Sequence, residues 1–166
     1  MLCYRGCYTD ELQASVFRVY KELYNADVTC KTVIFEGLKD VLDRLKSDGY
    51  RFAIVSNKPD FAAKTVANAL YGDGYFDRII GQKEGSALKP DPREVFSVMK
   101  ELEADAKDCI YVGDTDTDML TGKNANLYTV GVLWGFRGRE ELERSGADSI
   151  AETPEQLYKT IVHYKG

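Results

Sequence analysis

The sequence predicts an α/β fold: a Rossmann-like parallel sheet with helices on both faces, preceded by a helical segment outside the sheet. Short apolar segments alternate with amphipathic helical patterns from about residue 38 onward, and this alternation is typical of right-handed crossovers between parallel strands. The first 30 residues show helical periodicity without a strand. Polar residues follow three of the predicted strands, where ligands of parallel sheets bind.

Helices are predicted where apolar residues recur at spacings of three and four. The first spans 9–24, with acidic residues in its first turn. The second begins at Leu38, and Pro59 opens the third, which Gly72 ends. The remaining helices are expected at 92–104, 117–124, 139–145 and 154–164. Strands are expected between them, at 51–55, 78–80, 109–112 and 128–133.

Composition excludes several classes of protein. The 166 residues are 44% hydrophobic and 30% charged, which is typical of globular domains, and no apolar run is long enough to span a membrane. The net charge of −5 argues against nucleic-acid binding. The four cysteines are too sparse for a disulfide framework, and Cys3 and Cys7 lie far from the single histidine, His163, which argues against a zinc site. We therefore expect a cytoplasmic protein that binds neither nucleic acid nor membranes.

Two predicted strand ends carry groups suited to an anion. Ser56, Asn57 and Lys58 follow the first strand, where a hydroxyl and backbone N–H groups at a helix start suit a phosphate. Lys89 stands in a segment that contains Pro90 and Pro92, so we expect its charge to be held in place. An ordinary helix cap or loop would explain either feature alone.

A third strand end is rich in carboxylates. Asp114, Asp116 and Asp118 lie within five residues, and like charges this close repel unless a cation joins them. Oxygen ligands of this kind suit Mg²⁺, although an acidic loop is often a solvated turn. The order of the hydroxyl, the lysine and the acids, each at a strand end, favours a site.

The same residues carry a resemblance. Ser56–Pro59, Lys89–Pro92 and Val112–Thr115 with Asp118 match motifs of the haloacid dehalogenase-like hydrolases, and the tail from Val132 to Leu157 is similar to their phosphoglycolate phosphatase type. The resemblance covers the chain from about Val33 to the C-terminus. It implies a HAD-like α/β core that acts on a small phosphorylated metabolite and uses Mg²⁺.

The resemblance also implies roles for individual residues. Ser56 and the amide of Asn57 would bind phosphate, and Lys89 would neutralise the phosphoryl oxygens and the nucleophile. Asp114 would coordinate Mg²⁺ directly, with Asp118 beside it through water. Asp116 matches no motif position, and we expect it to be exposed.

One departure from the family pattern matters. The family reaction begins at an Asp-x-Asp sequence after a first strand, whose first aspartate attacks phosphorus and whose second acts as general acid and base. Nothing before Ser56 matches this pattern, and the closest segment, 32–37, holds no aspartate. We therefore expect a chain truncated at its N-terminus, with 1–30 as the remnant of a helical cap and 31–166 as a core lacking its first strand.

The missing strand would lie between the strands that end at Ser56 and Asp114. Its absence would leave sheet edges open to self-association, and the chain alone would have little or no activity. The alternatives are a non-catalytic phosphate- or metal-binding module, a receiver-like domain, or another phosphotransferase of the family such as a hexose-phosphate mutase or a pyrophosphatase. A receiver would carry its acidic pair early and its lysine last, which this order of motifs does not follow.

Overall fold

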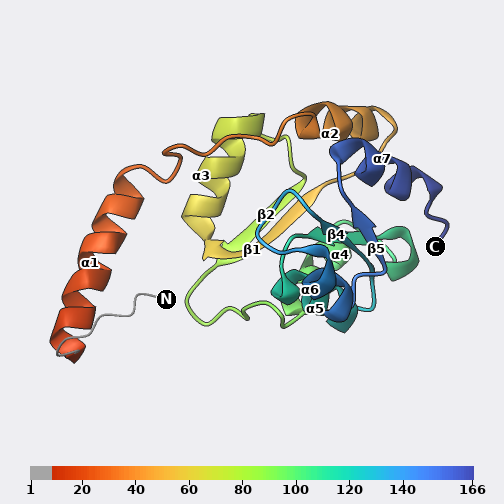
Figure 1. The fold of residues 1–166 in the computed structure, drawn as a ribbon. Coiled ribbons are helices and arrows are strands. Elements are labelled where there is room, and N and C mark those ends of the chain that lie inside the picture. Colours follow the sequence, from red (N-terminus) through yellow and green to blue (C-terminus); the bar gives the residue numbers. More distant parts are fainter. Residues whose placement is uncertain (1–8) are drawn as a thin grey trace. The chain divides into compact units, whose positions relative to one another are not determined.

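The computed structural model describes residues 9–166, so Cys3 and Cys7 lie outside the described residues (Figure 1). The chain divides into two compact units between Thr32 and Val33, close to the predicted domain boundary. No helix in the described part of the chain is long and apolar enough to cross a membrane.

The first unit contains the predicted helix. Helix α1 spans Asp10–Ala26, and the Thr9 side chain accepts the Leu12 N–H at 3.2 Å as its N-cap. Asp10 and Glu11 lie in the first turn, where negative charge stabilises a helix. Its role as a cap remnant stays a prediction.

All strands of the second unit pair in parallel, as predicted, but they form two sheets. Strand β1 (Ala53–Pro59) pairs with β2 (Arg78–Gln82), and β3 (Ile110–Gly113), β4 (Tyr128–Val132) and β5 (Ser149–Ala151) pair in that order. Among residues 9–166, β1 pairs only with β2 and β3 only with β4, so each keeps one unpaired edge. A missing central strand would produce such edges, and self-association through them stays a prediction.

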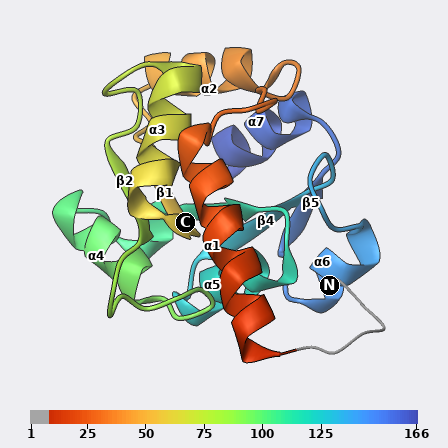
Figure 2. The same ribbon diagram turned by 90° about the vertical axis from the view of Figure 1, so that its left-hand side faces the viewer.

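Helices cover both sides of the strands, as predicted. Helices α2 (Leu38–Ser47) and α7 (Pro154–His163) lie on one side, and α4 (Arg93–Glu101), α5 (Asp116–Asn124) and α6 (Arg139–Arg144) lie on the other (Figures 1 and 2). Helix α3 (Asp60–Tyr71) contacts β1 and β2.

Two buried clusters hold these layers together. Val130 and Val132 of β4 pack with Ala151 and Leu157. Val95 of α4 packs with Ala125 and Leu127, and partly buried side chains from both sheets, Val55 of β1 and Tyr111 of β3, pack against this second cluster. Apolar packing on α4 therefore joins the two sheets that hydrogen bonds leave separate.

The structure differs from the predicted elements at several places. Strand β1 continues to Pro59, so Ser56, Asn57 and Lys58 lie in a strand and not at a helix start. A register shift against β2 after Val55 accommodates this extension. Helix α4 ends at Glu101, before the predicted 104, because the chain turns at Glu103 with φ +50°. Strand β5 was not predicted, because three residues are too few to show periodicity.

Candidate active site

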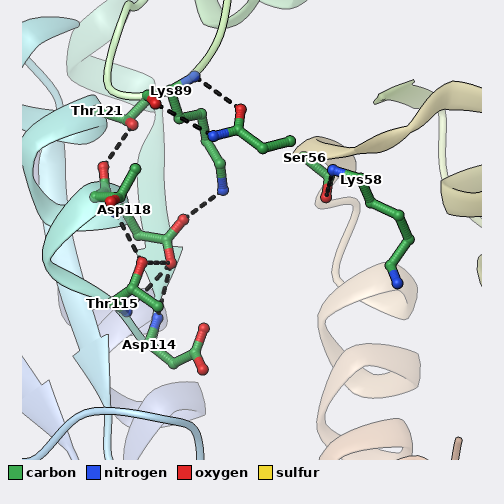
Figure 3. A network of polar contacts seen from close by, with 9 residues as sticks. Ser56, Lys58, Lys89, Asp114, Thr115, Asp118 and Thr121 are labelled. Atoms are coloured by element: carbon green, nitrogen blue, oxygen red, sulfur yellow. Dashed lines mark hydrogen bonds and ion pairs between the residues drawn. The ribbon is translucent and has the colours of Figure 1, made fainter. Parts of the chain in front are cut away.

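The centre of the site is an ion pair between Lys89 and Asp118. The Lys89 ammonium lies 2.6 Å from Asp118 Oδ1, and the two side chains are only 15% and 9% exposed (Figure 3). The other oxygen, Oδ2, accepts the Thr115 hydroxyl at 2.6 Å, the Thr115 N–H at 3.2 Å and the Asp114 N–H at 3.3 Å. Both oxygens of Asp118 are therefore engaged.

The local sequence explains this geometry. Thr115 is the N-cap of α5 and Asp118 its third residue, and together they form a capping box. Gly113 precedes them because an added Cβ would lie 2.2 Å from Asp118 Cβ. Burial, together with the charge of Asp118, raises the pKa of the neighbouring Tyr111 phenol, so this group is neutral at physiological pH.

Asparagine side chains hold the lysine segment. Asn57 Oδ1 accepts the Lys89 N–H at 2.8 Å, and Asn57 Nδ2 donates to the Lys89 carbonyl at 3.2 Å. Asn124 Nδ2 donates to the carbonyl of Pro90, which follows a cis peptide bond, at 2.9 Å. The side chain of Asn57 therefore positions Lys89. The sequence shows only the prolines of this segment, because a contact between residues 32 positions apart leaves no local signal.

We expect Asn57→Ala to lower the free energy of unfolding by about 1 kcal/mol, because it removes two hydrogen bonds to Lys89, although at an exposed position. Urea denaturation measures this loss. The control is Asn68→Ala, which removes a single exposed side-chain hydrogen bond to Asp73 and should cost less than about 0.5 kcal/mol. Equal losses in the two variants would contradict a role for Asn57 in holding Lys89.

Ser56 lies apart from the carboxylates. Its hydroxyl accepts the Lys58 N–H at 3.1 Å, and Figure 3 shows it across the site from Asp114 and Asp118. The structure thus brings Lys89 into contact with both Asn57 and Asp118. Ser56, next to Asn57 in β1, makes no hydrogen bond to Lys89 or to the carboxylates among the described residues. Phosphate binding by Ser56 and by the Asn57 amide stays a prediction.

One oxygen of the Asp114 carboxylate is available. Its Oδ2 accepts the Phe136 N–H at 2.9 Å, whereas no hydrogen bond between described residues reaches Oδ1. Asp114 is partly buried. Asp116, expected to be exposed, is also partly buried, and it is the first residue of α5.

The available Oδ1 of Asp114 is the feature that bears on whether Mg²⁺ fits this site. No group of three or more His, Cys, Asp or Glu side chains in residues 9–166 is arranged to hold a metal. Magnesium needs fewer protein ligands, because it commonly binds through one or two carboxylates together with water and substrate phosphate oxygens. Asp114 meets this requirement, whereas Asp118 is already neutralised by Lys89. The chemistry of these residues is compatible with Mg²⁺, and Asp114 as its direct ligand stays a prediction.

Comparison with known proteins identifies the family. The family model of the haloacid dehalogenase-like hydrolases matches residues 5–132. The chain belongs to this family. Among curated haloacid dehalogenase-like relatives, it is 32% identical to phosphoglycolate phosphatase from Aquifex aeolicus, over 92% of the chain and 70% of the relative. It is 31% identical to a candidate pyrophosphatase from Caldanaerobacter subterraneus, over 91% of the chain and 67% of the relative.

A solved structure agrees. A candidate phosphoglycolate phosphatase from Lactobacillus delbrueckii subsp. bulgaricus superimposes with a TM-score of 0.85 at 33% identity, over 92% of this chain and 64% of that one. The predicted family and fold class are confirmed. The chain spans about two thirds of the length of these haloacid dehalogenase-like relatives.

Proposed function

We propose that this chain supplies the phosphate- and magnesium-binding part of a phosphatase that hydrolyses a small phosphomonoester of the phosphoglycolate type. Water is consumed, the ester P–O bond is broken, and an alcohol and inorganic phosphate are released. The observation that carries the proposal is the buried Lys89–Asp118 pair beside the available oxygen of Asp114. The phosphoglycolate phosphatase from Aquifex aeolicus supports the substrate class.

The net charge of the site explains why phosphate binding would need magnesium. One ammonium, on Lys89, faces two carboxylates, on Asp114 and Asp118, which leaves a local net charge of −1. A phosphate dianion would be repelled by this excess negative charge. Bound Mg²⁺ would supply the positive charge that neutralises phosphoryl oxygens. Asp114 would hold it, while Asp118 keeps Lys89 in position.

The nucleophile that the family resemblance implies has no counterpart among the described residues. Residues 32–37 are irregular and contain no aspartate. No strand of residues 9–166 lies on the unpaired edge of β1 or β3 to carry one. We therefore propose that the 166-residue chain alone gives little or no turnover, and we expect it to bind magnesium and phosphate without hydrolysis.

Binding tests the first part of this proposal. In the presence of inorganic phosphate, Mn²⁺ used as a paramagnetic probe should broaden the NMR amide signals around Asp114, and Mg²⁺ should compete with it. Asp114→Asn should weaken binding at least tenfold, because a carboxylate ligand is lost. Asp116→Asn is the matched control, one charge removed two residues away, and should change affinity less than twofold. Absence of broadening, or equal effects of the two variants, would overturn the metal site.

Turnover tests the second part. A chimera that joins the N-terminal third of the Aquifex aeolicus relative to the start of this 166-residue chain should hydrolyse phosphoglycolate with Mg²⁺, because the chain itself matches the other 70% of that relative. In this chimera Lys89→Met should reduce the rate at least 100-fold. Pyrophosphate and a hexose phosphate, assayed alongside, distinguish the other substrates of the family. Turnover by the 166-residue chain that depends on Asp114 would disprove the inactivity. A folded chimera that binds both ligands without turnover would support a non-catalytic module instead.

A further inference from the structure

The loop between β4 and α6 contacts Asp114 through its backbone. The Phe136 N–H donates to Asp114 Oδ2 at 2.9 Å, and the Arg137 N–H donates to the Asp114 main-chain carbonyl at 3.2 Å. The Phe136 side chain is 88% exposed, so this residue acts on Asp114 through its amide and not through its ring. The two hydrogen bonds hold both the carboxylate and the backbone of Asp114.

Gly135 precedes Phe136 and lies so close to Asp114 that there is no room for a side chain. A Cβ at Gly135 would lie 2.2 Å from both Cβ and Oδ2 of Asp114, and 2.5 Å from its Cγ. The φ of Gly135 lies outside the left-handed region, so the constraint is space and not backbone conformation. Gly113 makes the equivalent close approach to Asp118, at 2.2 Å. Each carboxylate of the site is thus fixed against a glycine.

We propose that Gly135, with the Phe136 amide, is a positioning residue that orients the Asp114 carboxylate for Mg²⁺. The amide occupies Oδ2 and leaves Oδ1 free of hydrogen bonds within the described part of the chain. A side chain at Gly135 would push the Asp114 carboxylate away from the Phe136 amide and change the direction in which Oδ1 points. This inference rests on the proposed function, since it assumes that Asp114 binds the metal.

The decisive variant is Gly135→Ala. Its dissociation constant for Mg²⁺, measured by competition with Mn²⁺, should rise at least tenfold. The matched control is Gly138→Ala in the same loop, where no atom lies within 4 Å of the added Cβ and φ is −84°. This control, and Phe136→Ala, which keeps the amide and removes an exposed ring, should each change the constant less than twofold.

A measurement on the wild-type chain covers the outcome in which Gly135→Ala fails to fold. Titration with Mg²⁺ should shift the Phe136 amide resonance more than the Gly138 amide resonance. The reason is that the Phe136 amide, unlike that of Gly138, donates a hydrogen bond to Asp114. Metal binding by the wild type with an unchanged constant in Gly135→Ala, or with no shift at Phe136, would overturn the inference and leave the metal site intact. Absence of metal binding to the wild type would instead overturn the proposed function.

Discussion

Lys89→Met is expected to lower the free energy of unfolding by about 3 kcal/mol, because it leaves the Asp118 carboxylate largely buried without its cation. Lys89 and Asp118 are 15% and 9% exposed, so water cannot replace the lost partner well. The three remaining hydrogen bonds to Oδ2 keep the loss from being larger. Urea denaturation with an unchanged m-value measures the effect.

A double-mutant cycle separates the interaction energy of the Lys89–Asp118 pair from the other effects of each substitution. Adding Asp118→Asn to Lys89→Met should cost less than the sum of the single changes, by about 1 kcal/mol or more, because the two groups are in direct contact. The control is Lys39→Met. Lys39 pairs with Asp43 at 2.7 Å on the surface of α2, with side chains 45% and 47% exposed, and its loss should cost about 0.5 kcal/mol. A Lys89→Met effect as small as this control would contradict a buried, structurally important pair.

Leu142→Ala is expected to cost about 3 kcal/mol, because it opens a cavity in the core. Leu142 is fully buried in α6 and packs closely over Gly131 of β4, where an added Cβ would lie 3.1 Å from Leu142 Cδ1. Helix α6 has only six residues, too few to be stable without such packing. The melting temperature should fall by about 9 °C, which calorimetry or circular dichroism measures.

An exposed leucine provides the comparison for Leu142. Leu120 on α5 is 42% exposed, so Leu120→Ala leaves no closed cavity and should cost less than about 1 kcal/mol. The same number of methyl groups is removed in both variants. Similar losses would show that α6 contributes little to the fold, and that the loop 133–138 before it is not held by this packing.

Local features of the site could be predicted from the sequence. The spacing of Asp114 and Asp118 places one at a strand end and the other a helical turn later, and the structure has this arrangement. Which of the two acids pairs with Lys89 could not be predicted. Lys89 neutralises Asp118 alone and leaves Asp114 with an available oxygen, because only the folded chain brings a lysine from 29 residues away onto one of two similar acids.

The contacts that hold the site could not be predicted for the same reason, although Asn57 itself was a predicted site residue. Asn57 bonds to Lys89 across 32 residues, and Phe136 bonds to Asp114 across 22, so neither contact leaves a periodic or local signal. The second contact exists because β3 and β4 are neighbours in the sheet, which brings the ends of both strands together. Strand order is a property of pairing, and pairing is not local.

The sequence by itself determined the helices, most strands, their parallel direction and the family, because periodicity and motifs are properties of short segments. Only the tertiary structure decided that the strands form two sheets, which carboxylate meets Lys89 and which glycine is fixed against Asp114. These features depend on backbone pairing and on the space left between distant segments, and both arise only when the chain has folded.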